Sequence, residues 1–303
     1  PAHFALEVAL AAKHGVPPHH IVIGGGSDGI LGNLVRLFVG PGVAVVTSDG
    51  AYPTFNYHVN GFGGDLVKVP FDGDSEDPAA LIQMAQSVKA RLVYLSNPNN
   101  PMGSFHPRAR IEEMVAALPD GCLLCLDEAY ADFVDEDELP DIPVDHDRVI
   151  RLRTFSKAYG LAGIRIGYAI TNAPLANAFN KIRNHFGVNS IAQTAAVAAL
   201  ADTDHQASVR KAVAAALERV AGIAQANGCI GLPTRTNFIA VDCMQDGAFA
   251  GRVLQALIGQ GIFVRMPGVA PLDRCIRISA GTKSDLDALE AAFPKALQTA
   301  VVT

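Results

Sequence analysis

The stretch Arg153–Tyr168, with the sequence RTFSKAYGLAGIRIGY, decides our interpretation of this chain. In it, Lys157 directly follows a serine, and Arg165 comes eight residues after the lysine. An apolar run at Arg148–Leu152 leads into the stretch and another at Ile166–Ile170 leads out, which is typical of two buried strands. A lysine held between buried strands is a candidate for an amine with a shifted pKa that forms a Schiff base. The alternative is a solvated lysine and arginine on a glycine-rich turn.

Outward from this stretch, short apolar runs alternate with segments of helical length. The runs predict strands at Ile21–Ile23, Val43–Thr47, Leu66–Val69, Leu92–Ser96, Cys122–Leu126, Val149–Leu152 and Ile166–Ile170. The segments between them predict helices such as Ile30–Phe38, Pro78–Ser87 and Pro107–Leu118. This alternation favours an α/β fold with helices on both faces of a sheet.

The C-terminal third of the chain predicts a second, smaller α/β unit. Helices are expected at Ala173–Phe186, Ser190–Ala201, His205–Asn227 and Lys283–Leu297, and strands at Asn237–Val241, Ile262–Val264 and Cys275–Ser279. We therefore predict a large domain over residues 1–204 and a small C-terminal domain over residues 205–303. Because the chain starts with Pro1 and has no initiator methionine, we expect an upstream piece to be missing.

Composition excludes several classes of function. The net charge of -6 gives no basic surface for nucleic acid, and no apolar run has the roughly 20 residues needed to cross a bilayer. Of the five cysteines, Cys122 and Cys125 lie in a strand-like run where positions three apart face opposite sides, so we predict buried free thiols. The nine histidines show no spacing typical of a metal site, and we expect most of them at the surface. A cytoplasmic protein without a metal is the expectation.

Polar motifs follow the ends of several predicted strands. These motifs are Gly24–Gly29, Ala51–Tyr57, Ser96–Gly103 and Leu126–Tyr130. Ligands of α/β sheets collect at the carboxyl ends of strands, so these motifs and Lys157 are expected to line one site. A glycine-rich turn before a helix suits an anion, although it is a weak signal on its own. An aspartate such as Asp127 at a buried strand end needs a cationic partner, and Glu128 is expected farther out or at the surface.

The motifs in this order resemble those of the pyridoxal-phosphate-dependent aminotransferases of fold type I, and among them the histidinol-phosphate aminotransferase branch. The resemblance implies a homodimer with a mostly parallel mixed sheet covered by helices. It also implies pyridoxal 5'-phosphate as cofactor, bound to Lys157 as a Schiff base. The expected partners are an amino donor and a 2-oxo acid, with no nucleic acid, membrane or metal.

The resemblance also implies a role for each matching residue. Lys157, Asp127 and Tyr130 are expected to be catalytic, with Asp127 facing the pyridine nitrogen and Tyr130 the phenolic oxygen. The expected cofactor contacts further include Gly26, Ser27, Asp28, Ser156 and Arg165 at the phosphate, Phe55 stacked on the ring, and Asn100 at the phenolic oxygen. Arg277 is expected to hold the substrate's α-carboxylate, Arg265 to help with its distal group, and Asn237 to face the substrate. An arginine among apolar strand residues suits such a carboxylate, although a structural ion pair is the alternative.

Two other functions fit the same motifs. A phosphothreonine-type decarboxylase would use the same lysine, aspartate and phosphate site. A regulatory or binding domain would keep the fold without turnover, which retention of the whole set of polar residues argues against. The identity of the amino donor is not encoded in any single motif.

Overall fold

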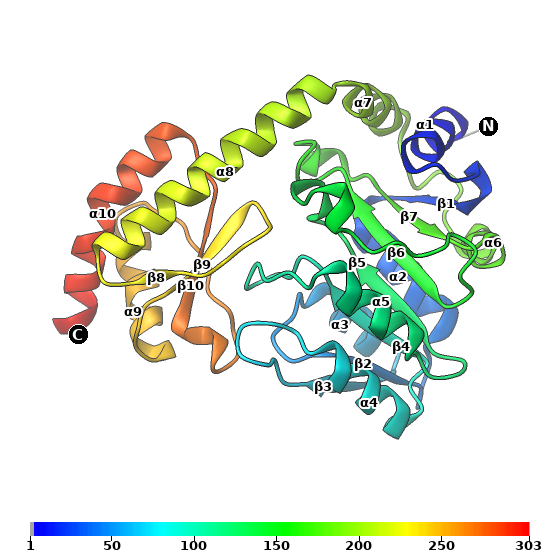
Figure 1. Ribbon diagram of the computed structural model, residues 1–303, viewed down its shortest axis with the longest axis horizontal. Helices are drawn as coiled ribbons and strands as arrows, with labels where there is room; N and C mark the ends of the chain where they lie inside the picture. The colour runs from blue at the N-terminus through cyan, green and yellow to red at the C-terminus, as the bar shows by residue number, and fades with distance from the viewer. Residues whose placement is uncertain (1–2, 303) are drawn as a thin grey trace.

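The computed structural model describes residues 3–302, which fold around a seven-stranded and a three-stranded β-sheet (Figure 1). The larger sheet has the strand order β1-β7-β6-β5-β4-β2-β3. Its strands are β1 Ile21–Gly24, β2 Ala44–Ser48, β3 Asp65–Val69, β4 Leu92–Ser96, β5 Leu123–Asp127, β6 Val149–Thr154 and β7 Gly167–Thr171. The run from β3 to β6 is parallel, and β7 pairs antiparallel with both β6 and β1. The predicted mostly parallel mixed sheet is confirmed.

Helices cover both faces of this sheet, because its strands are apolar on both sides. One face packs on α2 (Gly26–Phe38), α3 (Thr54–Gly61) and α6 (Ala173–Ile182). The other face packs on α4 (Pro78–Val88), α5 (Arg108–Ala116), α1 (Phe4–His14) and α7 (Ser190–Ala201). Cys122 lies in the second layer and Cys125 in the first, and both are free thiols. Their predicted placement on opposite faces is therefore confirmed.

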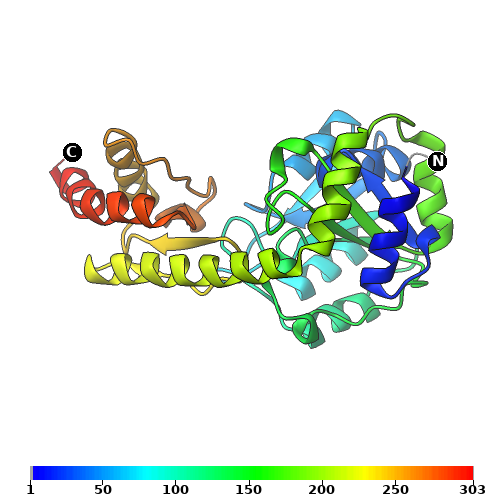
Figure 2. The same cartoon turned by 90° about the horizontal axis from the view of Figure 1, so that it is seen from above.

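The C-terminal part builds the small antiparallel sheet and its helices. The strands are β8 Ile230–Gly231, β9 Phe238–Asp242 and β10 Cys275–Ser279, and the helices are α8 Thr203–Ala226, α9 Gly247–Ile258 and α10 Lys283–Val302. α8 runs from the larger part of the molecule out along the small sheet (Figure 2). One face of that sheet packs on α8, α9 and α10. The predicted domain boundary between residues 204 and 205 falls near the start of α8 and stays a prediction.

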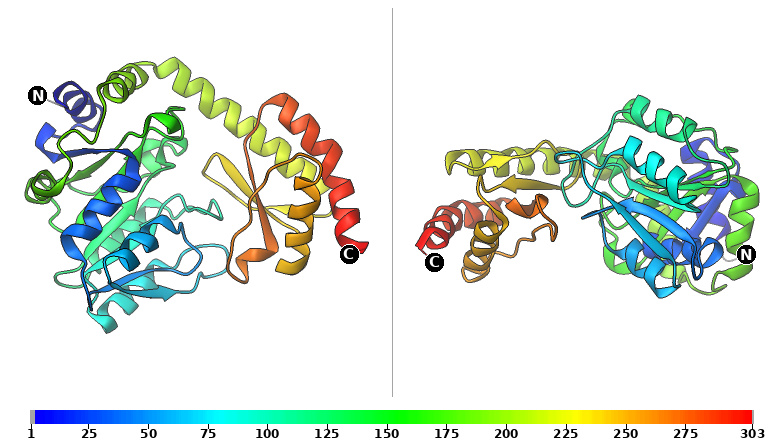
Figure 3. Two further views of the ribbon diagram at one scale, coloured as in Figure 1. Left: turned by 180° about the vertical axis from the view of Figure 1, so that it is seen from behind. Right: turned by 90° about the horizontal axis from the view of Figure 1, so that it is seen from below.

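The opposite face of the small sheet is turned toward the larger part of the molecule (Figure 3). Strand alternation puts Ala240 and Cys275 on this face, where they pack against Met102. Arg277 shares the face, two residues after Cys275. The small sheet thereby carries its arginine to the carboxyl ends of the large sheet's strands.

Several predicted elements differ from the observed ones. The predicted strand at Ile262–Val264 is wrong, because the amide of Ile262 closes the end of α9 by donating to Leu257 O, and only Arg265 bridges to β10. The helix predicted to reach Phe186 ends at Ile182, where the backbone becomes extended. α2 begins at Gly26 instead of Ile30. Helices α1, α3 and α9 were not predicted. The described part of the chain also contains five short 3-10 helices: η1 Pro18–His20, η2 Ala131–Phe133, η3 Glu136–Glu138, η4 Ala162–Ile164 and η5 Leu272–Arg274.

Most of the histidines are exposed or half-buried, as expected. His3 and His20 are buried, and burial lowers the pKa of His14 to about 3. Among residues 3–302, no group of three or more His, Cys, Asp or Glu side chains is arranged to hold a metal ion. Every helix in the described part of the chain falls short of the length or the apolar character that crossing a bilayer requires.

Candidate active site

A cavity lies at the carboxyl ends of β4, β5 and β6, where an α/β sheet is expected to bind its ligand. It brings together most of the predicted site residues from distant parts of the chain. Its lining consists of Ser27, Asp28, Tyr52, Tyr94, Ser96, Pro98, Asn100, Asp127, Ala129, Tyr130, Thr154, Ser156, Lys157 and Arg165.

Lys157 follows the end of β6 and lies in this lining with its amine uncommitted. Within residues 3–302 its Nζ makes no hydrogen bond or ion pair, and it lies 5.1 Å from the centroid of the Tyr130 ring. Burial lowers the pKa of Lys157, with the Arg277 and Arg165 charges adding to the effect, while Tyr52 and Asp127 oppose it. A lysine with a lowered pKa holds more of its amine in the neutral, nucleophilic form.

Asp127 is the last residue of β5 and is almost completely buried beside the cavity. Its Oδ2 accepts a hydrogen bond from the Tyr94 hydroxyl at 2.7 Å, and its Oδ1 accepts one from the Ala129 amide at 3.0 Å. Burial raises the pKa of Asp127, against the hydrogen bonds and the Lys157 charge. Because no cation of the protein pairs with it among the described residues, this carboxylate suits a positively charged nitrogen in the cavity.

The first turn of α2 and Arg165 form an anion site at one end of the cavity. No side chain caps α2, so amides of its first turn are free to donate. Gly26 has φ +81°, and a Cβ there would lie 2.5 Å from Arg165 Nη2, so the arginine packs directly on the glycine. The Asp28 carboxylate is paired with His58 Nε2 at 2.8 Å, so Asp28 offers the site its backbone amide.

Arg277 is not among the residues that line the cavity, but its Nη1 donates to Oδ1 of Asn100, which does line it. The Arg277 guanidinium lies 4.7 Å over the ring of Phe238, and its buried Nε has no hydrogen-bond partner among residues 3–302. Burial lowers the pKa of Arg277, with Tyr130 opposing the shift and Arg265 adding to it. A desolvated guanidinium with an unfilled donor suits a carboxylate ligand.

The structure does not bring every predicted residue to the cavity. The prediction that Phe55 stacks on a bound ring is wrong here, because Phe55 points from α3 into the core and stacks on Tyr94 with ring centroids 4.6 Å apart. Arg265 is exposed, and its backbone bridges to that of Arg277. Asn237 is half-buried just before β9, outside the cavity lining. The roles of Arg265 and Asn237 stay predictions.

Sequence reasoning missed four aromatic or hydroxyl residues of the lining and the two buried ion pairs of Glu128. Tyr52 lines the cavity just before α3, and Tyr94, Ser96 and Thr154 line it from β4 and β6. The alternation of β4 could have found Tyr94 and Ser96. Of the two positions expected for Glu128, the surface is wrong, because this carboxylate is buried outside the cavity lining and accepts from Arg151 Nη2 at 2.8 Å and Arg153 Nε at 2.7 Å.

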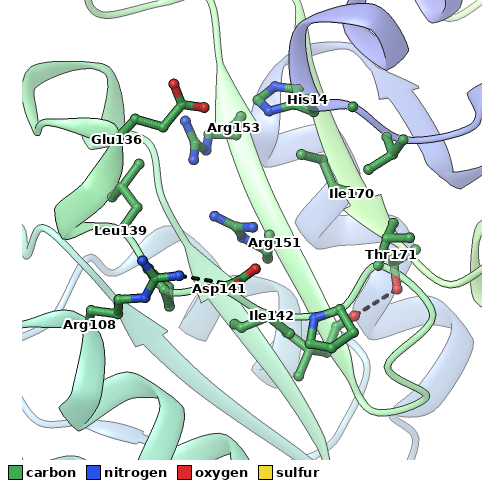
Figure 4. Close-up of a pocket in the computed structure, with 16 residues that line it drawn as sticks. His14, Arg108, Glu136, Leu139, Asp141, Ile142, Arg151, Arg153, Ile170 and Thr171 are labelled. Atoms are coloured by element: carbon green, nitrogen blue, oxygen red, sulfur yellow. Dashed lines mark hydrogen bonds and ion pairs between the residues drawn. The ribbon is translucent and has the colours of Figure 1, made fainter.

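A second cavity is lined by Arg151 and Arg153, among other residues (Figure 4). It is larger, with about 370 Å³ against about 110 Å³ for the cavity at Lys157. Both arginines donate to Glu128, and Arg108 on the opposite wall pairs with Asp141 at 3.3 Å. The residues that line this second cavity include no lysine. We therefore identify the candidate active site by its lining residues and not by its volume, and assign it to the smaller cavity at Lys157.

The chain is similar to known proteins over nearly its whole length. A family model described as aminotransferase class I and II matches residues 1–293. Histidinol-phosphate aminotransferase 2 of Ralstonia nicotianae is 37% identical over 303 residues, covering 98% of this chain and 80% of the relative. The histidinol-phosphate aminotransferase of Moorella thermoacetica is 34% identical over 284 residues, covering 92% and 72%. A crystal structure of the Sinorhizobium meliloti histidinol-phosphate aminotransferase in complex with pyridoxal-5'-phosphate has a TM-score of 0.95 at 49% identity, covering 98% of this chain and 82% of that one.

Proposed function

The chain belongs to the class I and II aminotransferase family as a pyridoxal-phosphate-dependent enzyme, and on that premise we propose that its amino donor is histidinol phosphate or a related amino alcohol or aromatic amino acid. The acceptor is a 2-oxo acid. The observation that carries the proposal is the uncommitted amine of Lys157 in a cavity with a buried aspartate and an anion site.

The residues present fit pyridoxal 5'-phosphate in three respects. The neutral amine of Lys157 is available to an aldehyde, the buried Asp127 suits a protonated ring nitrogen, and the first turn of α2 with Arg165 suits a phosphate. When bound, the cofactor supplies an aldehyde that condenses with amines and a ring that takes up electrons from the substrate's α-carbon.

Each residue has a separate task in this proposal. Lys157 would hold the cofactor through its amine, and once free this amine could carry the proton to and from the substrate's α-carbon. Asp127 would keep a ring nitrogen protonated, and the Tyr130 hydroxyl and the Asn100 amide group would donate to the phenolic oxygen. Ser156, Ser27 and Arg165 hold the phosphate, and charge-assisted hydrogen bonds of about 1.5–3 kcal/mol each suffice to retain it while Lys157 is free.

Two arginines select the substrate. Arg277 holds a carboxylate of the 2-oxo acid, since its desolvated fork has an unfilled donor. Arg265 is exposed next to Arg277 on the small sheet's edge, a position from which it can reach a distal phosphate. Asn237, which precedes β9, contacts the same substrate. Residues 1–204 act as the cofactor-binding domain and residues 205–303 as the unit that brings the arginines to it.

We further propose a cytoplasmic homodimer. A groove between α1 and α7 is lined in part by Phe186, which is 90% exposed, and Ile191 of α7, outside the groove, is 75% exposed. A contiguous apolar surface of this kind is typical of a subunit contact. The five cysteines are free thiols, as in proteins of a reducing compartment. Sedimentation of the protein at micromolar concentration tests the dimer, and a monomer mass would reject it.

A donor screen tests the function. The protein is incubated with pyridoxal phosphate and its visible absorbance band is followed as single amino donors are added. We expect histidinol phosphate to shift the band and to yield a keto product, and an added 2-oxo acid to restore it. Release of carbon dioxide without a keto product would indicate the decarboxylase instead. A protein that binds the cofactor without any donor-dependent shift would indicate a binding domain.

A further inference from the structure

Glu76, between β3 and α4, is a fully buried carboxylate for which the mechanism above has no task. Among residues 3–302, no lysine, arginine or histidine side chain forms an ion pair with it. Its four hydrogen bonds all come from uncharged donors. Oε2 accepts from Ser48 Oγ at 2.7 Å, and Oε1 accepts from Ser96 N at 3.1 Å, Ser96 Oγ at 2.7 Å and Asn99 Nδ2 at 2.7 Å.

These donors come from three separate places in the fold. Ser48 ends β2, Ser96 ends β4 and lines the active-site cavity, and Asn99 lies in the loop that follows β4. Burying a carboxylate without a cation is costly, and burial raises the pKa of Glu76 against its hydrogen bonds. A carboxylate at this position therefore requires an explanation beyond packing.

The loop of residues 97–106 is anchored on Glu76 at both ends. Asn99 is held by its Nδ2 on the Glu76 carboxylate, and its Oδ1 accepts from the Met102 amide at 3.0 Å. His106 Nε2 lies 2.8 Å from the Glu76 backbone oxygen, and the His106 amide donates to Asn97 Oδ1 at 2.8 Å. These two contacts fix the orientation of the Asn99 side-chain amide, because its Nδ2 must donate to Glu76 and its Oδ1 must accept from Met102.

Between these anchors the loop carries Asn100 into the cavity. Asn100 follows Asn99 directly and accepts the hydrogen bond from Arg277 Nη1. The loop also meets the small sheet's side of the molecule, where the Arg235 amide donates to Gly103 O at 3.0 Å. A displacement of Asn99 would therefore move the partner of Arg277.

We propose that Glu76 is a positioning residue for the aminotransferase reaction. By holding Ser96 and Asn99 it fixes Asn100, and through Asn100 it sets the guanidinium of Arg277 that receives the carboxylate of the 2-oxo acid. This inference rests on the proposed function. A carboxylate suits the task because its two oxygens accept from four donors at once, and an apolar side chain of similar size would leave all four donors unsatisfied.

Steady-state kinetics with 2-oxoglutarate as the amino acceptor test whether Glu76 acts on Arg277 through Asn100. Glu76→Leu, which removes all four acceptor contacts, is expected to raise KM for 2-oxoglutarate about tenfold, the free energy of one hydrogen bond, with kcat within about threefold of wild type. Asn100→Ala should raise KM as well, and the KM of the double variant should be no higher than that of Asn100→Ala, because Glu76 acts through Asn100. Glu76→Asp, which keeps the carboxylate, should recover part of the loss. The proposal would be overturned if the two KM effects multiplied in the double variant, or if the KM of Glu76→Leu lay within twofold of wild type.

Amide hydrogen exchange gives a second readout that does not depend on activity. Glu76→Leu should speed exchange in residues 97–106, and the matched control Phe179→Leu, in the core of α6 away from the cavity, should not. If Glu76→Leu does not fold, Asn99→Ala removes the hydrogen bond between Asn99 and Glu76 and should reproduce both effects. A wild-type protein without amino transfer would reject the proposed function, whereas unchanged loop exchange in both variants would reject the role of Glu76.

Discussion

Replacing Glu128 with Gln should destabilise the protein far more than the loss of a surface ion pair. Glu128 is 1% exposed and accepts from Nε and Nη2 of Arg151 and from Nε of Arg153, whose side chains are 17% and 6% exposed. A glutamine keeps one acceptor oxygen but turns an NH2 group toward the guanidinium donors. Removing one partner of a buried ion pair costs about 3–5 kcal/mol, because the other charge stays buried.

The cavity beside Arg151 and Arg153 decides where in the range of about 3–5 kcal/mol we expect the loss of stability to lie. Because water there can reach part of both guanidinium groups, we expect a loss near the lower end, about 3 kcal/mol (Figure 4). Urea unfolding followed by circular dichroism measures it. Glu112→Gln is the matched control, since Glu112 pairs with Arg108 at the surface and its loss should leave the unfolding midpoint unchanged.

The pH dependence of this loss follows from the pKa of Glu128. Burial alone would raise that pKa, but the two guanidinium groups together hold it below its ordinary value. Glu128 therefore contributes fully to the free energy of unfolding at pH values above its pKa in the unfolded chain, which is about 4.3. This contribution is lost as the pH falls through the lower pKa that Glu128 has in the folded protein. Wild type and Glu128→Gln should converge at strongly acidic pH. A Glu128→Gln variant within about 1 kcal/mol of wild type at pH 7 would refute the reasoning.

Three further outcomes are expected. Arg277→Lys should raise KM for the 2-oxo acid by about tenfold to a hundredfold in steady-state kinetics, because an ammonium cannot form the two-pronged bond, and an unchanged KM would contradict this. The amine of Lys157 should react with an acylating reagent with a pH midpoint below the ordinary lysine value of about 10.4, as mapped by mass spectrometry, since burial lowers its pKa. Gly26→Ala should weaken cofactor binding about tenfold in a titration, because the new Cβ meets Arg165 and strains a positive φ, while Gly29→Ala, with open space around it, should not.

The strands and the motifs at their ends were predictable because both are local patterns. Apolar runs identified the large sheet, and the motif at Lys157 identified the residues that meet at its carboxyl edge. The position of Phe55 was not predictable, since whether an aromatic ring on α3 faces core or cavity depends on the phase of a helix that the sequence does not mark. Glu76 gave no signal because its partners come from three segments that only the folded chain brings together. The surface alternative for Glu128 was wrong because the arginines that neutralise this buried carboxylate lie on the neighbouring strand.

The central claim is that the amine of Lys157 joins the cofactor covalently. Borohydride reduction after incubation with pyridoxal phosphate, followed by peptide mass spectrometry, tests it most directly. We predict a single phosphopyridoxyl group on the peptide containing Lys157, absent from Lys157→Ala. Stable labelling of another lysine in its place, or an unlabelled protein, would contradict the assignment of this cavity.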